Sequence, residues 1–145
     1  MKTFATNRRA RYDYDLGETI LAGVILSGSE VKSIRNNHVS LKGSYVVLKN
    51  GELYLRGALI NRYQPAGDLN HDPSRDRKLL VTKNQQKMFV ANRQNGHYII
   101  PIRLVEKRGF IKLAVATGRS KTKHDKRRSI KKKDIRRDIN RELSR

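Results

Sequence analysis

The chain of 145 residues contains no cysteine at all. Without thiols it forms no disulfide, no thiolate metal site and no cysteine nucleophile. No apolar run approaches the roughly 20 residues that a membrane-spanning helix needs. The stretch before Tyr14 also lacks the apolar centre of a signal peptide. These absences predict a soluble, cytoplasmic protein with no membrane partner.

Acidic residues are scarce as well. Only 13 Asp or Glu stand against 33 Lys or Arg, which gives a formal net charge of +20. Residues 118–145 alone carry 13 bases and four acids, a local charge of +9, and residues 1–117 are themselves at +11. A basic tail on a basic body is attracted to a polyanion, so nucleic acid is the first partner to consider. An anionic membrane surface is the physical rival.

The sequence offers little for catalysis. Its four histidines are separated by spacings that match no metal-ligand motif: His38, His71, His97 and His124. Asp72 and Asp76 could form a carboxylate pair for Mg²⁺, but ion pairing with the interleaved bases Arg75, Arg77 and Lys78 is the simpler interpretation. No phosphate-binding loop, dinucleotide fingerprint or nucleophile elbow is present. We therefore predict no enzyme, no metal and no cofactor.

In the first half, local patterns predict strands and one short helix. Residues 12–26 are rich in β-branched and aromatic residues and are typical of a strand. Ser29 is placed to cap a short helix, with Glu30 in the first turn and Val31 and Ile34 facing the core. Asn50-Gly51 between two apolar runs predicts a tight β-hairpin.

The second half repeats this alternation. Residues 64–76 contain two prolines and many polar residues, which indicates a long loop. Thr82 followed by Gln85 forms a capping box for a helix that Met88 and Phe89 would attach to the core. A second hairpin should turn near residues 107–109, and Pro101 should mark a sheet edge or a bulge because it has no N–H to donate.

Together these patterns predict a mainly β protein with short helices. About six short strands favour a small closed β-barrel of the OB type over residues 1–117. Residues 118–145 form the second part, a basic tail in which Ile135, Ile139 and Leu143 share one helical stripe. Helices this short and this charged are marginal alone, so we expect the tail to be disordered when free and helical on a phosphate-lined surface.

Three places stand out as candidate RNA contacts. Glu30 either serves the start of its helix or accepts hydrogen bonds from base amino groups or ribose hydroxyls. The segment from Asn7 to Tyr12 sets three arginines beside an aromatic ring, and it is either an RNA contact or a basic arm leading into the first core residue. Lys112 alternates with Ile111 and Leu113, so it should point out of its sheet.

The chain resembles one family closely, the SsrA-binding (SmpB) proteins. The matching stretches occur in the right order and cover nearly the whole chain: NRRARYDY (7–14), ETILAGVILSGSEVKSIR (18–35), GSYVVLKNGELYL (43–55), DPSRDRKLL (72–80) and HDKR (124–127). The chain departs from the family pattern at Gly43, where an acid is common. It departs again at Gly118-Arg119-Ser120, which precedes an apparent two-residue insertion before Asp125.

The resemblance implies a function. SmpB proteins bind the tRNA-like domain of transfer-messenger RNA (tmRNA) and deliver it to stalled ribosomes for trans-translation. EF-Tu with GTP takes part indirectly, through the charged RNA. The protein replaces the missing anticodon arm on the small subunit, and its tail probes the empty mRNA channel as a helix.

The resemblance also implies which residues act. The residues expected to bind tmRNA are Asn7, Arg8, Arg9, Glu30, Lys32, Arg77, Lys78, Leu79, Leu80 and Lys112. Those expected in the decoding centre and mRNA channel are Tyr12, Gly118, His124, Asp125, Lys126, Arg127, Ile130, Lys131, Ile135 and Ile139. Tyr12 stands where the family often has His.

Two other classes of function stay open at this point. A structural ribosomal protein that binds rRNA would share the small β body and the basic extension. A nuclease would use the histidines or Asp72. Without the resemblance, charge and pattern do not separate the rescue factor from the ribosomal protein.

Overall fold

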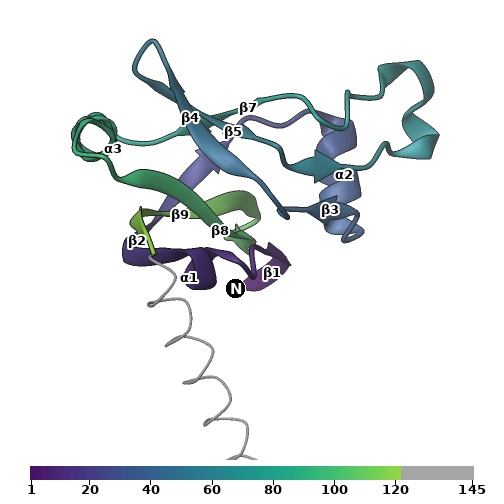
Figure 1. Cartoon of the computed structure of the whole chain (residues 1–145). Helices are drawn as coiled ribbons and strands as arrows, with labels where there is room; N and C mark the ends of the chain where they lie inside the picture. The colour runs from purple at the N-terminus through teal and green to yellow at the C-terminus, as the bar shows by residue number, and fades with distance from the viewer. Residues whose placement is uncertain (122–145) are drawn as a thin grey trace, which may run out of the picture.

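A computed structural model of the chain describes residues 1–121, which are built around one seven-stranded antiparallel sheet (Figure 1). In chain order the elements are β1 (Lys2–Thr6), α1 (Ala10–Asp13), β2 (Tyr14–Val24), α2 (Gly28–Arg35), β3 (Val39–Ser40), β4 (Tyr45–Lys49), β5 (Glu52–Arg56), β6 (Leu59–Ile60), the 3₁₀ helix η1 (Gln64–Leu69), β7 (Arg77–Leu80), α3 (Lys83–Gln94), β8 (Tyr98–Lys107) and β9 (Phe110–Ser120).

The expected closed barrel is wrong for these residues, although the mainly β composition is confirmed. The seven strands pair in the order β1-β8-β9-β2-β7-β5-β4, and no ladder joins the edge strands β1 and β4. The sheet curls far enough to bring β4 beside β8. On the side where a closing ladder would lie, the short ribbon of β3 and β6 packs against β1 and α2 instead.

The concave face of the sheet holds the main core. Alternating residues of each strand point into it together with one residue from each longer helix, Ile34 of α2 and Phe89 of α3. Its strand residues include Phe4, Leu53, Leu55, Ile99, Leu104, Leu113 and Val115. A smaller cluster on the opposite face contains Ala10, Ile100, Ile102, Ala114 and Ala116. Because β9 alternates between the two clusters, its register fixes both faces at once.

Both predicted hairpins are confirmed. Asn50 and Gly51 adopt φ of 53° and 77° between Lys49 and its cross-strand partner Glu52. Arg108 and Gly109 adopt φ of 51° and 81° at the second turn. Pro101 lies at a shift of register between β8 and β9, as expected for a residue with no N–H.

Four local expectations need correction. The strand predicted from Tyr12 begins at Tyr14, because Tyr12 belongs to α1, which buries Ala10 against the sheet. The cap of α2 is Ser27 rather than Ser29. In α3 the capping box of Thr82 and Gln85 and the burial of Phe89 are confirmed, but Met88 is 36% exposed. Part of the expected loop 64–76 folds as η1.

Gly118 lies inside β9, opposite Leu16 and Tyr98, so the strand continues past the residue expected to open the tail. Lys121 then donates its backbone N–H to the Asp13 carbonyl over 2.9 Å. The chain therefore leaves the sheet next to α1. The other tail residues singled out above lie outside the described residues, namely His124, Asp125, Lys126, Arg127, Ile130, Lys131, Ile135, Ile139 and Leu143.

The β4–β5 turn gives a direct test of this fold. We expect Gly51→Ala to lower the free energy of unfolding by about 1 kcal/mol, because a Cβ is strained at positive φ. A Cβ at Gly51 would meet nothing closer than the Gln86 side chain at 3.7 Å, so the loss reports backbone strain alone. Urea unfolding measures it.

The matched control is Gly28→Ala, at a helical position where a Cβ meets nothing within 4 Å. It should be neutral or slightly stabilising, since alanine favours helix over glycine. Equal losses for the two variants would contradict the assigned turn.

Candidate nucleic-acid interface

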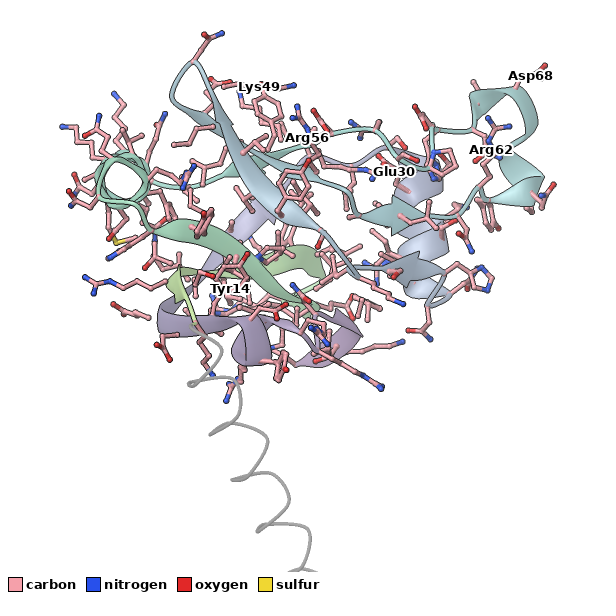
Figure 2. All side chains as sticks on the ribbon, in the orientation of Figure 1. Tyr14, Glu30, Lys49, Arg56, Arg62 and Asp68 are labelled. Atoms are coloured by element: carbon pink, nitrogen blue, oxygen red, sulfur yellow. The ribbon has the colours of Figure 1, made fainter. Side chains whose placement is uncertain are left out.

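The acid Glu30 is held at the start of α2 by a capping box. Ser27 donates its backbone N–H to Glu30 Oε1 over 2.9 Å, and Ser27 Oγ accepts from the Glu30 N–H at 3.4 Å. Ser29, the residue first expected to cap, instead contacts His71 Nδ1 through its hydroxyl over 2.8 Å. The carboxylate is thereby aimed away from α2 toward the segment before β7 (Figure 2).

Two arginines neutralise Glu30: Arg75, which precedes β7, and Arg77, the first residue of β7. Arg77 donates from Nε to Glu30 Oε2 over 2.7 Å, while Arg75 donates from Nε to Oε1 over 3.2 Å and from Nη2 to the same oxygen. Arg77 also donates to the Ala58 carbonyl at 2.9 Å and the Pro73 carbonyl at 3.0 Å. One carboxylate and one guanidinium therefore tie together α2, the β5–β6 connection and the loop before β7.

Burial by itself would raise the pKa of Glu30. The hydrogen bonds from Arg75, from the Ser27 N–H and from Arg77 outweigh that effect and lower the pKa below its ordinary value. Glu30 and Arg77 are both without exposed surface. Neither side chain presents surface to an RNA in this conformation.

The outer face of the sheet, above these buried groups, carries Lys112 and Leu80. Lys112 of β9 lies opposite Gly23 of β2, which lies opposite Leu80 of β7. Leu80 is 51% exposed, whereas Leu79 is 3% exposed and points into the core. A Cβ on Gly23 would approach Leu80 Cβ to 3.2 Å. We call Lys112, Gly23 and Leu80 the outer row: a cation and an apolar side chain on either side of a buried glycine.

Further bases and aromatic rings extend this face. Lys78 of β7 lies opposite Tyr54 of β5, and its Nζ is 3.1 Å from the Glu52 carboxylate. Phe110 is 69% exposed, and the Lys112 ammonium lies 6.0 Å from the centre of its ring. Exposed rings beside lysines are suited to stacking with bases and pairing with phosphates.

Asp76 forms the other ion-pair cluster. Its carboxylate accepts from Arg56 Nη2 and from Lys49 Nζ, both at 2.9 Å (Figure 2). These bonds lower the pKa of Asp76 to about 2. The ion pairing predicted for Asp76 is confirmed, but its partners come from β4 and β5 rather than from the adjacent bases. Among the described residues the Asp72 carboxylate accepts only the Ser74 N–H, while the Asp72 carbonyl accepts from Arg77 Nη2 over 3.3 Å.

A separate basic site lies around α1. Asn7 donates its side-chain amide to the Pro101 carbonyl over 2.9 Å, which anchors the chain entering α1. The Arg9 guanidinium lies 4.5 Å from the centre of the Tyr12 ring and 3.3 Å from Asp13, and Arg8 is exposed. Lys121 donates from Nζ to the Arg11 carbonyl over 2.6 Å, so the root of the tail lies against the helix that carries Tyr12.

The described residues offer no alternative chemistry. Within residues 1–121 no three acidic or histidine side chains gather in a way that would hold a metal ion. Over the same range, no helix has the length and apolar character needed to cross a membrane. His71, the buried histidine, bridges Ser29 and the Ile60 carbonyl and so serves the fold.

Comparison with known proteins decides the family. The family model described as SmpB protein matches residues 4–145. The chain belongs to the SmpB family. SsrA-binding proteins of Staphylococcus aureus, from strains JH1 and Newman among others, are 43% identical to it over 142 residues, which is 97% of this chain and 92% of the relative.

A solved structure shows the same relationship. One chain of the structure described as "tmRNA-SmpB: a journey to the center of the bacterial ribosome" superimposes with a TM-score of 0.65 and 39% identity. The match covers 91% of this chain and 94% of that one.

Sequence reasoning missed several residues of this candidate interface. Gly23 and Tyr54 join the outer face because strand register places them beside Lys112, Leu80 and Lys78. Phe110, two residues before Lys112 on β9, joins the same face. Arg75 was taken as a partner for nearby aspartates, yet it pairs with Glu30, far away in the sequence. Period-2 alternation in β7 and β9 was the one available signal, and it separates Leu80 from Leu79 correctly.

The buried ion pairs predict a specific loss of stability. Glu30→Gln should lower the free energy of unfolding by about 3 kcal/mol, because it leaves the buried Arg77 guanidinium without its counter-charge. Glu18→Gln, on an exposed carboxylate of β2, should change it by less than about 0.5 kcal/mol. Chemical denaturation at neutral pH measures both, and similar losses would contradict the assigned network.

The same pair predicts a pH dependence. Because folding lowers the pKa of Glu30, its contribution is complete above the ordinary value of 4.5 and is lost as pH falls through that value toward the folded one. The stability gap between the parent protein and Glu30→Gln should therefore narrow below pH 4.5. A gap that stays constant or widens would show that Glu30 is not ionised in the fold.

Proposed function

We propose that this protein binds the tRNA-like domain of tmRNA and delivers it to stalled ribosomes for trans-translation. The outer row carries the proposal, because it sets Lys112 and the exposed Leu80 on the same outer face, one on each side of Gly23. Support comes from membership of the SmpB family and from the likeness to a chain solved with tmRNA in its description.

The outer face would grip RNA by phosphate pairing and apolar contact. Lys112 and Lys78 neutralise phosphates, while Leu80 packs against ribose or base. Gly23 lets β7 pack closely against β2, because a Cβ there would approach Leu80 Cβ to 3.2 Å. Glu30, Arg77 and Leu79 act from inside, by fixing α2 and β7 beneath this face.

A second contact would lie around α1. Tyr12 stands in for the aromatic residue that stacks in the ribosomal decoding centre, with Arg8 and Arg9 beside it. Asn7 acts through the backbone that it anchors to β8. Lys32, exposed on α2, adds a cation on the flank of the body.

The basic segment after β9 would probe whether the mRNA channel is empty. We propose that it enters the vacant mRNA channel and folds there as a helix, with Asp125, Lys126 and Arg127 near its start and Ile130, Ile135 and Ile139 along it. Gly118 within β9 sets its direction. EF-Tu with GTP would join indirectly, through the charged RNA, in the cytoplasm.

Two variants separate the two kinds of contact on the outer row. Lys112→Gln should weaken binding of the tRNA-like RNA and reduce the slope of log affinity against log salt by roughly 0.7–0.9, because one phosphate contact is lost. Leu80→Ala should weaken binding at every salt concentration with the slope unchanged.

Lys83→Gln on α3 is the matched control, since it removes the same charge from an exposed lysine that is not part of the outer row. Filter binding over a salt series measures all three. A slope change as large for Lys83→Gln as for Lys112→Gln would contradict the assigned face.

Truncation after Lys121 tests the proposed role of the tail in the mRNA channel. A chain ending at Lys121 keeps the whole of β9, so it should bind the tRNA-like RNA nearly as well as the full chain. It should lose tagging of nascent peptides on stalled ribosomes in a reconstituted translation system. Undiminished tagging by the truncated protein would refute the proposed role of the tail.

A further inference from the structure

A hollow of about 540 Å³ lies beyond the C-terminal end of α2, apart from both contacts proposed above. We call it the α2 hollow. Five polar residues line it: Asn36, His38, Asn61, Arg62 and Gln64. They come from three places that the fold brings together, namely the end of α2, the segment before β3 and the chain between β6 and η1. Figure 2 labels Arg62 on this lobe, next to α2.

The backbone around the α2 hollow is firmly held. The buried Ser33 hydroxyl donates to the Asn61 carbonyl over 2.6 Å, and the Asn61 N–H donates to the His38 carbonyl over 3.0 Å. The Asn70 side chain brackets Tyr63, accepting from its N–H at 2.9 Å and donating to its carbonyl at 2.8 Å. The hollow is therefore a preformed feature of the fold.

The side chains of the five polar residues, in contrast, do nothing for the fold. Among the described residues none of these five makes a side-chain hydrogen bond, ion pair or ring contact. Three carboxamides, an imidazole and a guanidinium are thus converging without internal partners. Amides that both donate and accept are the groups that read the edges of unpaired bases.

The rest of the lining supplies surfaces for stacking and charge. Leu59, Pro65 and Tyr63 provide apolar and aromatic surface, and Leu59 is 45% exposed. The Lys32 ammonium lies 5.5 Å from the centre of the Tyr63 ring. Arg62 and Lys32 therefore place positive charge at the hollow, and no acid lines it.

We propose that the α2 hollow binds one unpaired nucleotide of RNA. The base packs against Pro65, Leu59 and Tyr63, the amides of Asn61 and Asn36 bond its edge, and Arg62 pairs with a flanking phosphate. This goes beyond the proposed function, because the hollow shares no residue with the outer row and would accept a base from any single strand.

The experiment uses the full chain and short single-stranded RNAs, each of one base type. Two-dimensional NMR of the side-chain amides reads Asn36, Asn61 and Gln64 directly. We expect these signals to shift on titration, and the affinity of the double variant Asn61→Ala/Arg62→Ala to fall about tenfold. The matched control Asn84→Ala/Lys83→Ala removes a carboxamide and one positive charge from α3 and should bind as the parent does.

A duplex RNA and a poly-glutamate peptide serve as the other probes. The proposal is supported if neither shifts the three amide signals at concentrations where single strands do. It is overturned if the single strands leave those signals unmoved, if the peptide shifts them equally, or if the two double variants lose the same affinity. Intact binding of the tRNA-like RNA by Asn61→Ala/Arg62→Ala would leave the proposed function standing, since the outer row is untouched.

Discussion

The pairing of the Glu30 carboxylate with Arg75 and Arg77 is the interaction on which the rest of this molecule depends. This protein has a net charge of +20 and few acidic residues, yet it buries the Glu30 side chain completely. Two guanidinium groups offset the cost of desolvating the carboxylate. Arg77 also donates hydrogen bonds to three backbone carbonyls. Without it, α2 and the loop before β7 would have little to hold them in register with the sheet.

Buried and exposed charges have different roles in this protein. The buried pair fixes the position of α2 against the sheet, whereas Lys112, Lys78 and the arginines around α1 remain accessible to phosphate. A second cluster, Asp76 with Lys49 and Arg56, gives the same cross-strand support at the β4–β5 edge. An RNA-binding protein of this charge would repel itself if its bases were not spread over separate faces, and the curled sheet provides those faces.

Local chemistry was predictable from the sequence, and long-range pairing was not. The Asn50-Gly51 turn and the Thr82–Gln85 capping box follow from residues within four positions of each other, so both could be predicted without the fold. The partner of Glu30 lies 45 and 47 positions away, and neither propensity nor periodicity encodes such a distance. Glu30 was therefore expected at the surface, where a first-turn acid usually lies.

Long-range packing also explains why the expected barrel and the expected strand at Tyr12 were wrong. Strand count and strand spacing indicated a barrel, but whether β1 and β4 close a ladder depends on how the sheet curls and on the ribbon of β3 and β6 between them. Tyr12 was assigned to a strand on its β propensity. The contact of Ala10 with the small core decides instead for a helix there, because tertiary packing overrides the weak preference of a few residues.

The central claim is that Glu30 organises the body of the protein from within, and amide hydrogen exchange in Glu30→Gln tests it most directly. We predict that the amides of Ile25 and Ile60, which bond to the Lys78 and Pro73 carbonyls across the joints of the network, lose far more protection than those in the middle of β8 and β9. If these two amides stay as protected as the β8–β9 hairpin, the network does not hold the joints together and the central claim is wrong.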